Sequence, residues 1–136
     1  MKLAIAVVAL VLAASPLAAQ DAADSWERGA DPVTLTNGLH AGDVFVTCSE
    51  HSGYVRVSVP ASAARPVGVS VGAVRAVSRE DAFDQGRARG WFEAGDPVWA
   101  AALADGGLTV DGQRIAFTSE RDKRYFALTM RVCAAS

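Results

Sequence analysis

Cysteine, histidine and lysine are scarce in this sequence of 136 residues. With two cysteines, two histidines and no CxxC pair, the chain lacks the donors of a Cys/His zinc site, and we expect neither a metal nor a cofactor. Acidic residues outnumber basic ones by 15 to 13, which gives a formal net charge of −2. This balance disfavours nucleic acid and an anionic membrane surface as partners.

Long apolar runs are also missing beyond the first one. Lys2 precedes the apolar run Leu3–Ala14, and Ser15-Pro16 then breaks it ahead of small residues that end at Ala19. This layout is typical of a secretory signal peptide. The run is too short to cross about 30 Å of hydrocarbon as a helix. We therefore expect residues 1–19 to be cleaved near Ala19, with an uncleaved anchor as the alternative.

The residue that follows the predicted cleavage site is Gln20, where a bacterial lipoprotein would have Cys. No second apolar run follows, so we expect no stable membrane insertion after cleavage. The predicted location is the bacterial periplasm or the medium. Removal of 19 residues leaves 117, which is the length of a single domain.

The two cysteines, Cys48 and Cys133, both lie in the exported part and are 85 positions apart. In an oxidising compartment two cysteines usually pair, so we expect a disulfide that stabilises the fold by at most about 4–5 kcal/mol. The alternatives are two buried thiols or one reactive thiol.

Residues 20–31 are polar and acidic except for Trp26, and we expect a loose N-terminal arm ahead of one β-rich domain over residues 32–136. Trp26 either pins this arm to the body of the protein or is exposed for recognition. The sequence does not decide whether Trp91 and Trp99 are buried.

Alternating apolar residues predict a mainly β fold, either a small antiparallel sandwich or a barrel. The strongest local signal is a hairpin in which 43–48 pairs with 54–59, because Val55, Val57 and Val59 share one face. The remaining expected strands are 33–35 (ended by a turn at Asn37-Gly38), 67–77, 90–92, and a hairpin of 108–110 with 114–117 around Asp111-Gly112. The polar stretch 80–89 is expected to be a loop.

One short helix is predicted at about 97–105, since Asp96 suits the N-cap, Pro97 the first turn and Gly106 the C-terminal cap. The tail is ambiguous. Alternation over 125–132 favours a strand, whereas Ser119 with Asp122 is a possible helix start.

Gly68–Gly72 matches the G-x-S-x-G pattern of a nucleophile elbow around Ser70. In that motif a helix follows the serine and the catalytic histidine comes later in the chain. Here both histidines, His40 and His51, precede Ser70, and the string alternates like a strand. We expect no catalytic residue and no enzymatic activity.

Five residues form the candidate interaction surface. His51 is expected at a hairpin tip beside Glu50, where it is either an acid–base group or a solvated loop residue. The others are Tyr54, Arg87, Arg89 and Trp91. The two arginines form a cationic patch with Arg121, Lys123 and Arg124 if their loops meet in space, and otherwise belong to a surface of balanced charge.

The order of several segments resembles small periplasmic proteins of the type VI secretion-associated VasI family and of the invasion-associated locus B family. The segments are FVTC, YVRVSV, VWAAALADGGLTV and FALTMRVC, within about residues 43–133. The resemblance implies a β-rich accessory protein and carries over no catalytic residues.

The early and late cysteines are also similar to those of periplasmic lysozyme inhibitors, which present a Ser-Gly loop and a Tyr to the enzyme. Ser52-Gly53-Tyr54 offers these residues, although here they follow the first cysteine directly. We therefore expect an exported, non-enzymatic accessory or binding protein whose partner is another envelope protein. The alternatives are an inhibitor of a cell-wall hydrolase and a small enzyme, and the oligomeric state is open.

Overall fold

The computed structural model describes residues 24–136, the side chains of residues 80 and 81 excepted. The expected signal peptide at 1–19 therefore lies outside the described residues. Ten strands and two helices follow one another along the described chain: β1 (Glu27–Ala30), β2 (Asn37–Ala41), β3 (Val44–Thr47), β4 (Tyr54–Pro60), β5 (Gly68–Val71), β6 (Val74–Val77), β7 (Arg79–Asp84), β8 (Arg87–Glu93), α1 (Pro97–Asp105), β9 (Gly107–Val110), β10 (Gln113–Ala116) and α2 (Glu120–Cys133).

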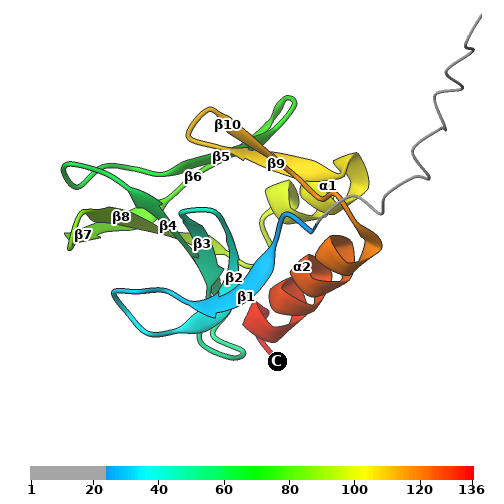
Figure 1. Cartoon of the computed structure of the whole chain (residues 1–136), viewed down its shortest axis with the longest axis horizontal. Helices are drawn as coiled ribbons and strands as arrows, with labels where there is room; N and C mark the ends of the chain where they lie inside the picture. Colours follow the sequence, from blue (N-terminus) through cyan, green and yellow to red (C-terminus); the bar gives the residue numbers. More distant parts are fainter. Residues whose placement is uncertain (1–23) are drawn as a thin grey trace, which may run out of the picture.

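The strands form two antiparallel sheets (Figure 1). The six-stranded sheet has the order β1-β2-β3-β4-β8-β7, and the four-stranded sheet has the order β10-β9-β5-β6. Helix α1 packs against β5, β6 and β9, whereas α2 contacts β2, β4 and α1. The predicted mainly β fold is confirmed, and the described strands form no closed barrel.

Five aromatic rings fill the centre of the core. Phe126 of α2 lies between Trp26, Trp99 and Phe117, with ring centroids 4.8 to 6.2 Å apart, and Phe92 meets Trp99 edge-on. All five are buried. Full burial of a large apolar side chain contributes about 1.5–3 kcal/mol, so this cluster accounts for much of the packing between the helices and the sheets. Trp26 and Trp99 are therefore core residues, whereas Trp91 is half-buried.

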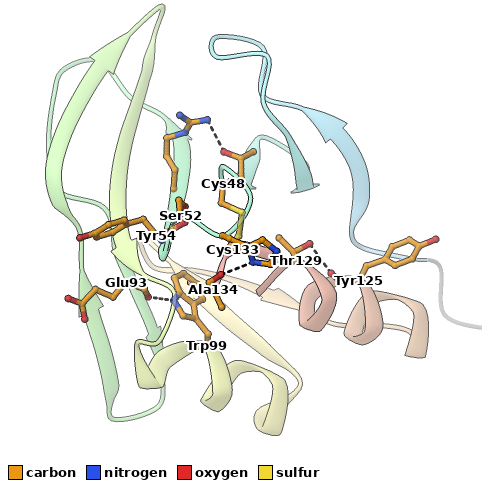
Figure 2. Close-up of a disulfide and its surroundings, with 12 residues drawn as sticks. Cys48, Ser52, Tyr54, Glu93, Trp99, Tyr125, Thr129, Cys133 and Ala134 are labelled. Carbon is orange, nitrogen blue, oxygen red and sulfur yellow. Dashed lines mark hydrogen bonds between the residues drawn. A yellow bond between two sulfur atoms is a disulfide. The ribbon is translucent and has the colours of Figure 1, made fainter. Parts of the chain in front are cut away.

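The predicted disulfide is confirmed. Cys48, directly after β3, is bonded to Cys133 at the end of α2, with the two Cα atoms 5.5 Å apart. Figure 2 shows that this bond ties the C-terminal helix to the end of the first predicted hairpin.

Three local predictions are confirmed, and each rests on a strong local signal. Strands β3 and β4 pair as the expected hairpin. Helix α1 has the predicted bounds, with the Asp96 carboxylate accepting from the Val98 N–H and Gly106 left-handed at the C-terminus. The β9–β10 hairpin turns at Asp111-Gly112, where both residues have positive φ.

The N-terminal region differs from its prediction. From Ser25 onward the expected loose arm is held down, because the N–H groups of Ser25 and Trp26 donate to the carboxylate of Asp122 in α2, and β1 then pairs with β2. The predicted strand at 33–35 is also wrong. Asp31 accepts from the N–H groups of Val33 and Thr34, which folds this stretch into a turn, and Asn37-Gly38 begins β2 instead.

Two predictions in the middle of the chain are wrong as well. The stretch 67–77 is a hairpin of β5 and β6, because Gly72 takes a positive φ between them. The polar stretch 80–89, predicted as a loop, belongs to the β7–β8 hairpin, which turns at Gln85-Gly86. The strand expected at 90–92 is the second half of β8.

The tail is a helix, so the favoured strand at 125–132 is wrong and the fold has two helices where one was predicted. The Ser119 hydroxyl accepts from the Asp122 N–H and starts α2. Phe126, Met130 and Cys133 then face the core at helical spacing. Burial of these three side chains favours the helix more strongly than the alternating pattern favours a strand.

Candidate functional site

The candidate site is the outer face of the six-stranded sheet. In β4 and β8, Val55, Val57 and Phe92 point into the core, so their neighbours along each strand point outward. Directly opposed residues of an antiparallel pair share a face. The register therefore places Tyr54, Arg56 and Ser58 of β4 beside Arg87, Arg89 and Trp91 of β8, with Phe45 and Thr47 of β3 on the other side. We call these eight residues the arginine face.

Arg87 is the structural arginine of this face. Its side chain is buried, and Nε donates to the Ser58 hydroxyl at 2.7 Å while Nη2 donates to the carbonyl oxygens of Ser58 and Asp43. The guanidinium also lies over the Phe45 ring, 5.0 Å from its centroid. Burial lowers the pKa of Arg87, although Asp31 and Asp43 oppose the shift. This predicted interaction residue is therefore buried on the sheet, with its Nε and Nη2 donors already used.

Arg56 is only half-buried and has two hydroxyl partners. Its Nη2 donates to Thr34 Oγ1 at 2.7 Å and to Thr47 Oγ1 at 3.0 Å. Thr34 belongs to the turn that Asp31 organises, so the β1–β2 connection reaches the guanidinium on β4. On the other side, Arg56 Cζ lies 5.9 Å from the centre of the Trp91 ring.

Arg56 lacks a close carboxylate among the described side chains. None lies within the 4.0 Å of an ion pair. Burial lowers its pKa, Asp31 raises it, and the positive charge of Arg89 lowers it further. Its Nε atom is shielded from solvent and has no hydrogen-bond acceptor within the described part of the chain.

The side chain of Arg89 has neither a hydrogen bond nor an ion pair to any residue that the structure describes. Its Nε is likewise shielded and unpaired. Arg89 opposes Ser58 in the register and is therefore diagonal to Arg56. Diagonal positions on neighbouring strands are about 7–8 Å apart, so the two guanidinium groups approach each other. A half-buried arginine with no partner is the most unusual feature of this face.

Two aromatic side chains border the arginine pair. Trp91 opposes Arg56 in the register and lies two residues from Arg89 in β8. Tyr54 is 48% exposed at the start of β4, and Figure 2 shows its ring pointing away from α2. Three of the five predicted interaction residues, Tyr54, Arg89 and Trp91, therefore share one accessible surface.

His51 belongs to another part of the molecule. Its N–H donates to the Val132 carbonyl at 2.7 Å, and its Nδ1 lies 3.1 Å from the Ala134 carbonyl oxygen. Its Nε2 is 3.6 Å from Glu50 Oε1. The histidine holds the β3–β4 loop against the end of α2, beside the disulfide.

Ser70 lies inside β5, where it pairs with Arg75 of β6 and Thr109 of β9. A nucleophile elbow needs a strand-to-helix turn at the serine, so the G-x-S-x-G string has a different conformation here.

Over residues 24–136, no three His, Cys, Asp or Glu side chains gather in a way that could hold a metal ion. None of the helices in that range is long and apolar enough to span a membrane. Comparison of the chain with family models, with known proteins and with solved structures gives no match. The arginine face therefore has to be interpreted from its own chemistry.

Sequence reasoning missed Arg56, Thr34 and Asp31 as members of this site. The alternation in YVRVSV does place Arg56 on the same side as Tyr54. The strand that pairs with Arg56, β8, was not predicted in full, because 80–89 was expected to be a loop.

Proposed function

We propose that this chain is an exported binding protein without catalytic activity, and that it holds another protein of the bacterial envelope through the arginine face. The observation that carries the proposal is the pair Arg56 and Arg89. Both are half-buried, neither has a carboxylate in contact among the described side chains, and both adjoin the accessible ring of Trp91. Arginine and aromatic residues are enriched at the energetic centres of protein interfaces.

The layout of charge supports a binding role for this pair. Arg79 is paired with Glu93 at 3.2 Å, and Arg87 is satisfied by Ser58 and Asp43. Arg56 and Arg89 remain as the unmatched cations of the described face. A partner that supplies acceptors would satisfy donors that the fold itself leaves open.

The test is affinity capture of the tagged protein from the periplasm of its own host. We expect a stoichiometric partner with wild-type protein, its loss with Arg89→Gln, and its retention with Arg75→Gln. Arg75 is an exposed arginine of edge strand β6 in the other sheet, so the control removes the same charge elsewhere. Equal capture by both variants would contradict the proposal.

A second candidate function is inhibition of a cell-wall hydrolase by the loop Ser52-Gly53-Tyr54. The favouring observation is the rigidity of this loop. The Gly53 N–H donates to the Cys133 carbonyl at 2.8 Å, and Ser52 Oγ donates to the Tyr54 carbonyl at 3.2 Å, while Tyr54 stays exposed (Figure 2). Preorganised loops lose little entropy on binding.

This candidate predicts that an equimolar amount of protein suppresses lysozyme activity and that Tyr54→Ala abolishes the effect. Arg89→Gln would leave inhibition unchanged, which separates the two functions.

A further inference from the structure

The spacing and charge of the Arg56–Arg89 pair indicate what kind of ligand it binds. Arg89 is diagonal to Arg56 on one face of neighbouring strands, and its positive charge opposes that of Arg56. An anion between the two side chains would relieve this repulsion. In the described part of the chain, Asp31 is the one carboxylate that acts on Arg56, whereas Asp31 and Asp43 both act on Arg87. Two carboxylates beside Arg56, Arg87 and Arg89 leave the face positively charged.

Asp31 does not contact either arginine of the pair. Its side chain is fully buried; Oδ1 accepts from the N–H groups of Val33 and Thr34, and Oδ2 has no hydrogen-bond partner among the described residues. It lies beyond ion-pair distance of every described arginine. No described carboxylate contacts Arg56 or Arg89, so a direct contact with an anion is left for a ligand.

We infer that Arg56, Arg89 and Trp91 form a binding site for carboxylate groups, and that the occupant is an extended acidic segment of the partner protein. This inference rests on the proposed binding function and adds the chemistry of the partner. A guanidinium presents planar, paired donors that match the two oxygens of a carboxylate. Nε of both arginines is shielded from solvent, so a ligand would meet the Nη groups: those of Arg89 bond to no described residue, and Arg56 uses only Nη2.

The distance between the arginines favours an extended segment. Residues i and i+2 of a strand lie about 6.6 Å apart and point to the same side. The diagonal spacing of Arg56 and Arg89, about 7–8 Å, is close to this value. Two Asp or Glu side chains at i and i+2 would therefore each meet one guanidinium, while Trp91 contacts the chain between them.

Charge elsewhere on the protein argues against a long polyanion as the occupant. The formal net charge is −2, so the protein as a whole does not attract a long polyanion. A short acidic stretch gains the local contacts without meeting the acidic remainder of the surface.

The direct test is titration with a short synthetic peptide in which glutamate alternates with serine, followed by calorimetry at low salt and at about 0.15 M ionic strength. The matched control peptide carries glutamine in place of each glutamate. We expect the glutamate peptide to bind wild-type protein, and Arg89→Gln to weaken this binding about tenfold or more. Arg75→Gln should leave it unchanged, and the glutamine peptide should not bind.

Arg89→Gln is preferred over Arg56→Gln because Arg89 bonds to no described group, so its loss leaves the fold without an open hydrogen bond. Circular dichroism and the unfolding midpoint check that each variant is folded. Inorganic phosphate serves as a competitor: displacement of the peptide by equimolar phosphate would overturn the assignment to carboxylate. Equal weakening by Arg75→Gln, or equal binding of the glutamine peptide, would also overturn it.

Failure of this inference can be told apart from failure of the proposed function. If capture of an envelope partner depends on Arg89 but the acidic peptide does not bind, the face binds a partner of other chemistry and the inference is wrong. If the peptide binds as expected and no envelope protein is captured, the carboxylate site stands and the proposed function is wrong.

Discussion

Asp122 is the point at which the N-terminus is fastened to the rest of the fold, and its removal should be among the most damaging single changes. The carboxylate is fully buried. Oδ2 accepts from the N–H groups of Ser25 and Thr118, both at 3.0 Å, and from the Thr118 hydroxyl at 3.2 Å. Oδ1 accepts from the Trp26 N–H at 3.2 Å. Three backbone donors therefore depend on one side chain.

In Asp122→Ala these donors lose their acceptor at a site with little access to water. A buried donor left unpaired costs about 1–3 kcal/mol, and partial rescue by water makes about 4 kcal/mol a reasonable expectation for the set. This is a large part of the roughly 5–15 kcal/mol that stabilises a typical domain. In Asp122→Asn the amide still accepts through one oxygen but turns a donor toward at least one N–H, so we expect about 2 kcal/mol.

The assay is urea unfolding of wild type, both variants and Glu120→Gln, followed by tryptophan fluorescence. Glu120 lies in the same helical turn with its side chain 85% exposed, so its substitution should change the free energy of unfolding by less than about 0.5 kcal/mol. A loss below about 1 kcal/mol for Asp122→Ala would refute the reasoning.

The pH dependence of the same residue gives a second check. Burial raises the pKa of Asp122, but the hydrogen bonds from Ser25, Thr118 and Trp26 outweigh burial and hold the pKa below its ordinary value of 3.8. A carboxyl group whose pKa is depressed in the folded state stabilises the fold above its unfolded pKa, and this contribution is lost as the pH falls through the folded pKa. The difference in stability between wild type and Asp122→Asn should therefore be constant from neutral pH to about 5 and shrink below about 3.5. A difference that grows on acidification would contradict this assignment.

Three further changes test other parts of the fold, all by the free energy of unfolding in urea. The double substitution of Cys48 and Cys133 by Ala should lower the free energy of unfolding by up to about 4–5 kcal/mol, since the disulfide closes a segment of 85 residues. A loss below about 1 kcal/mol would mean that the disulfide does not constrain the unfolded chain. Arg87→Gln should lower the free energy of unfolding by about 2–3 kcal/mol because it removes three hydrogen bonds, whereas Arg89→Gln should be neutral or slightly stabilising. A larger loss for Arg89→Gln than for Arg87→Gln would contradict the assignment of Arg87 as the structural arginine. Gly90→Ala should destabilise the fold by about 1–3 kcal/mol, because the added Cβ would come 2.1 Å from the Cβ of Ser78. Gly95→Ala is the control and should be tolerated, since its added Cβ would have no atom within 4 Å.

The parts of the fold that could be predicted are those in which a single local signal decides the structure. Asp96-Pro97 and Gly106 bracket α1, and Asp111-Gly112 supplies two residues with positive φ to a two-residue turn. In the β3–β4 hairpin, valines of period two coincide with the buried face of the sheet. In each case the local preference and the tertiary environment agree.

The tail shows what happens when two local patterns compete. Alternation placed Phe126, Leu128, Met130 and Val132 on one strand face. In the helix only Phe126 and Met130 are buried, while Leu128 is 40% and Val132 is 38% exposed. The helical conformation brings Asp122, Phe126, Met130 and Cys133 to the same, buried side of α2. The disulfide of Cys133 with Cys48 then holds the C-terminal end of the helix in place. The alternating pattern weighs apolar residues alone, whereas Ser119 and Asp122 marked the correct start of the helix.

The sequence predicted several residues of the candidate site, but it did not predict how they lie relative to one another. The sequence analysis predicted Tyr54, Arg89 and Trp91 as interaction residues, and the strand register places them on one face. Arg87 has the same side chain as Arg89 and lies two residues away on the same face, yet it is buried and hydrogen-bonded through Nε and Nη2. The difference comes from their neighbours across the strands: Arg87 reaches the Ser58 hydroxyl and the Asp43 carbonyl, whereas Arg89 finds Arg56 on the diagonal. The Ser58 hydroxyl, which lies opposite Arg89 in the register, is used by Arg87, and the side chain of Arg89 is left without an acceptor among the described residues. That distinction depends on register, so it appears only once β7, β8 and the turn at Asp31 are in place.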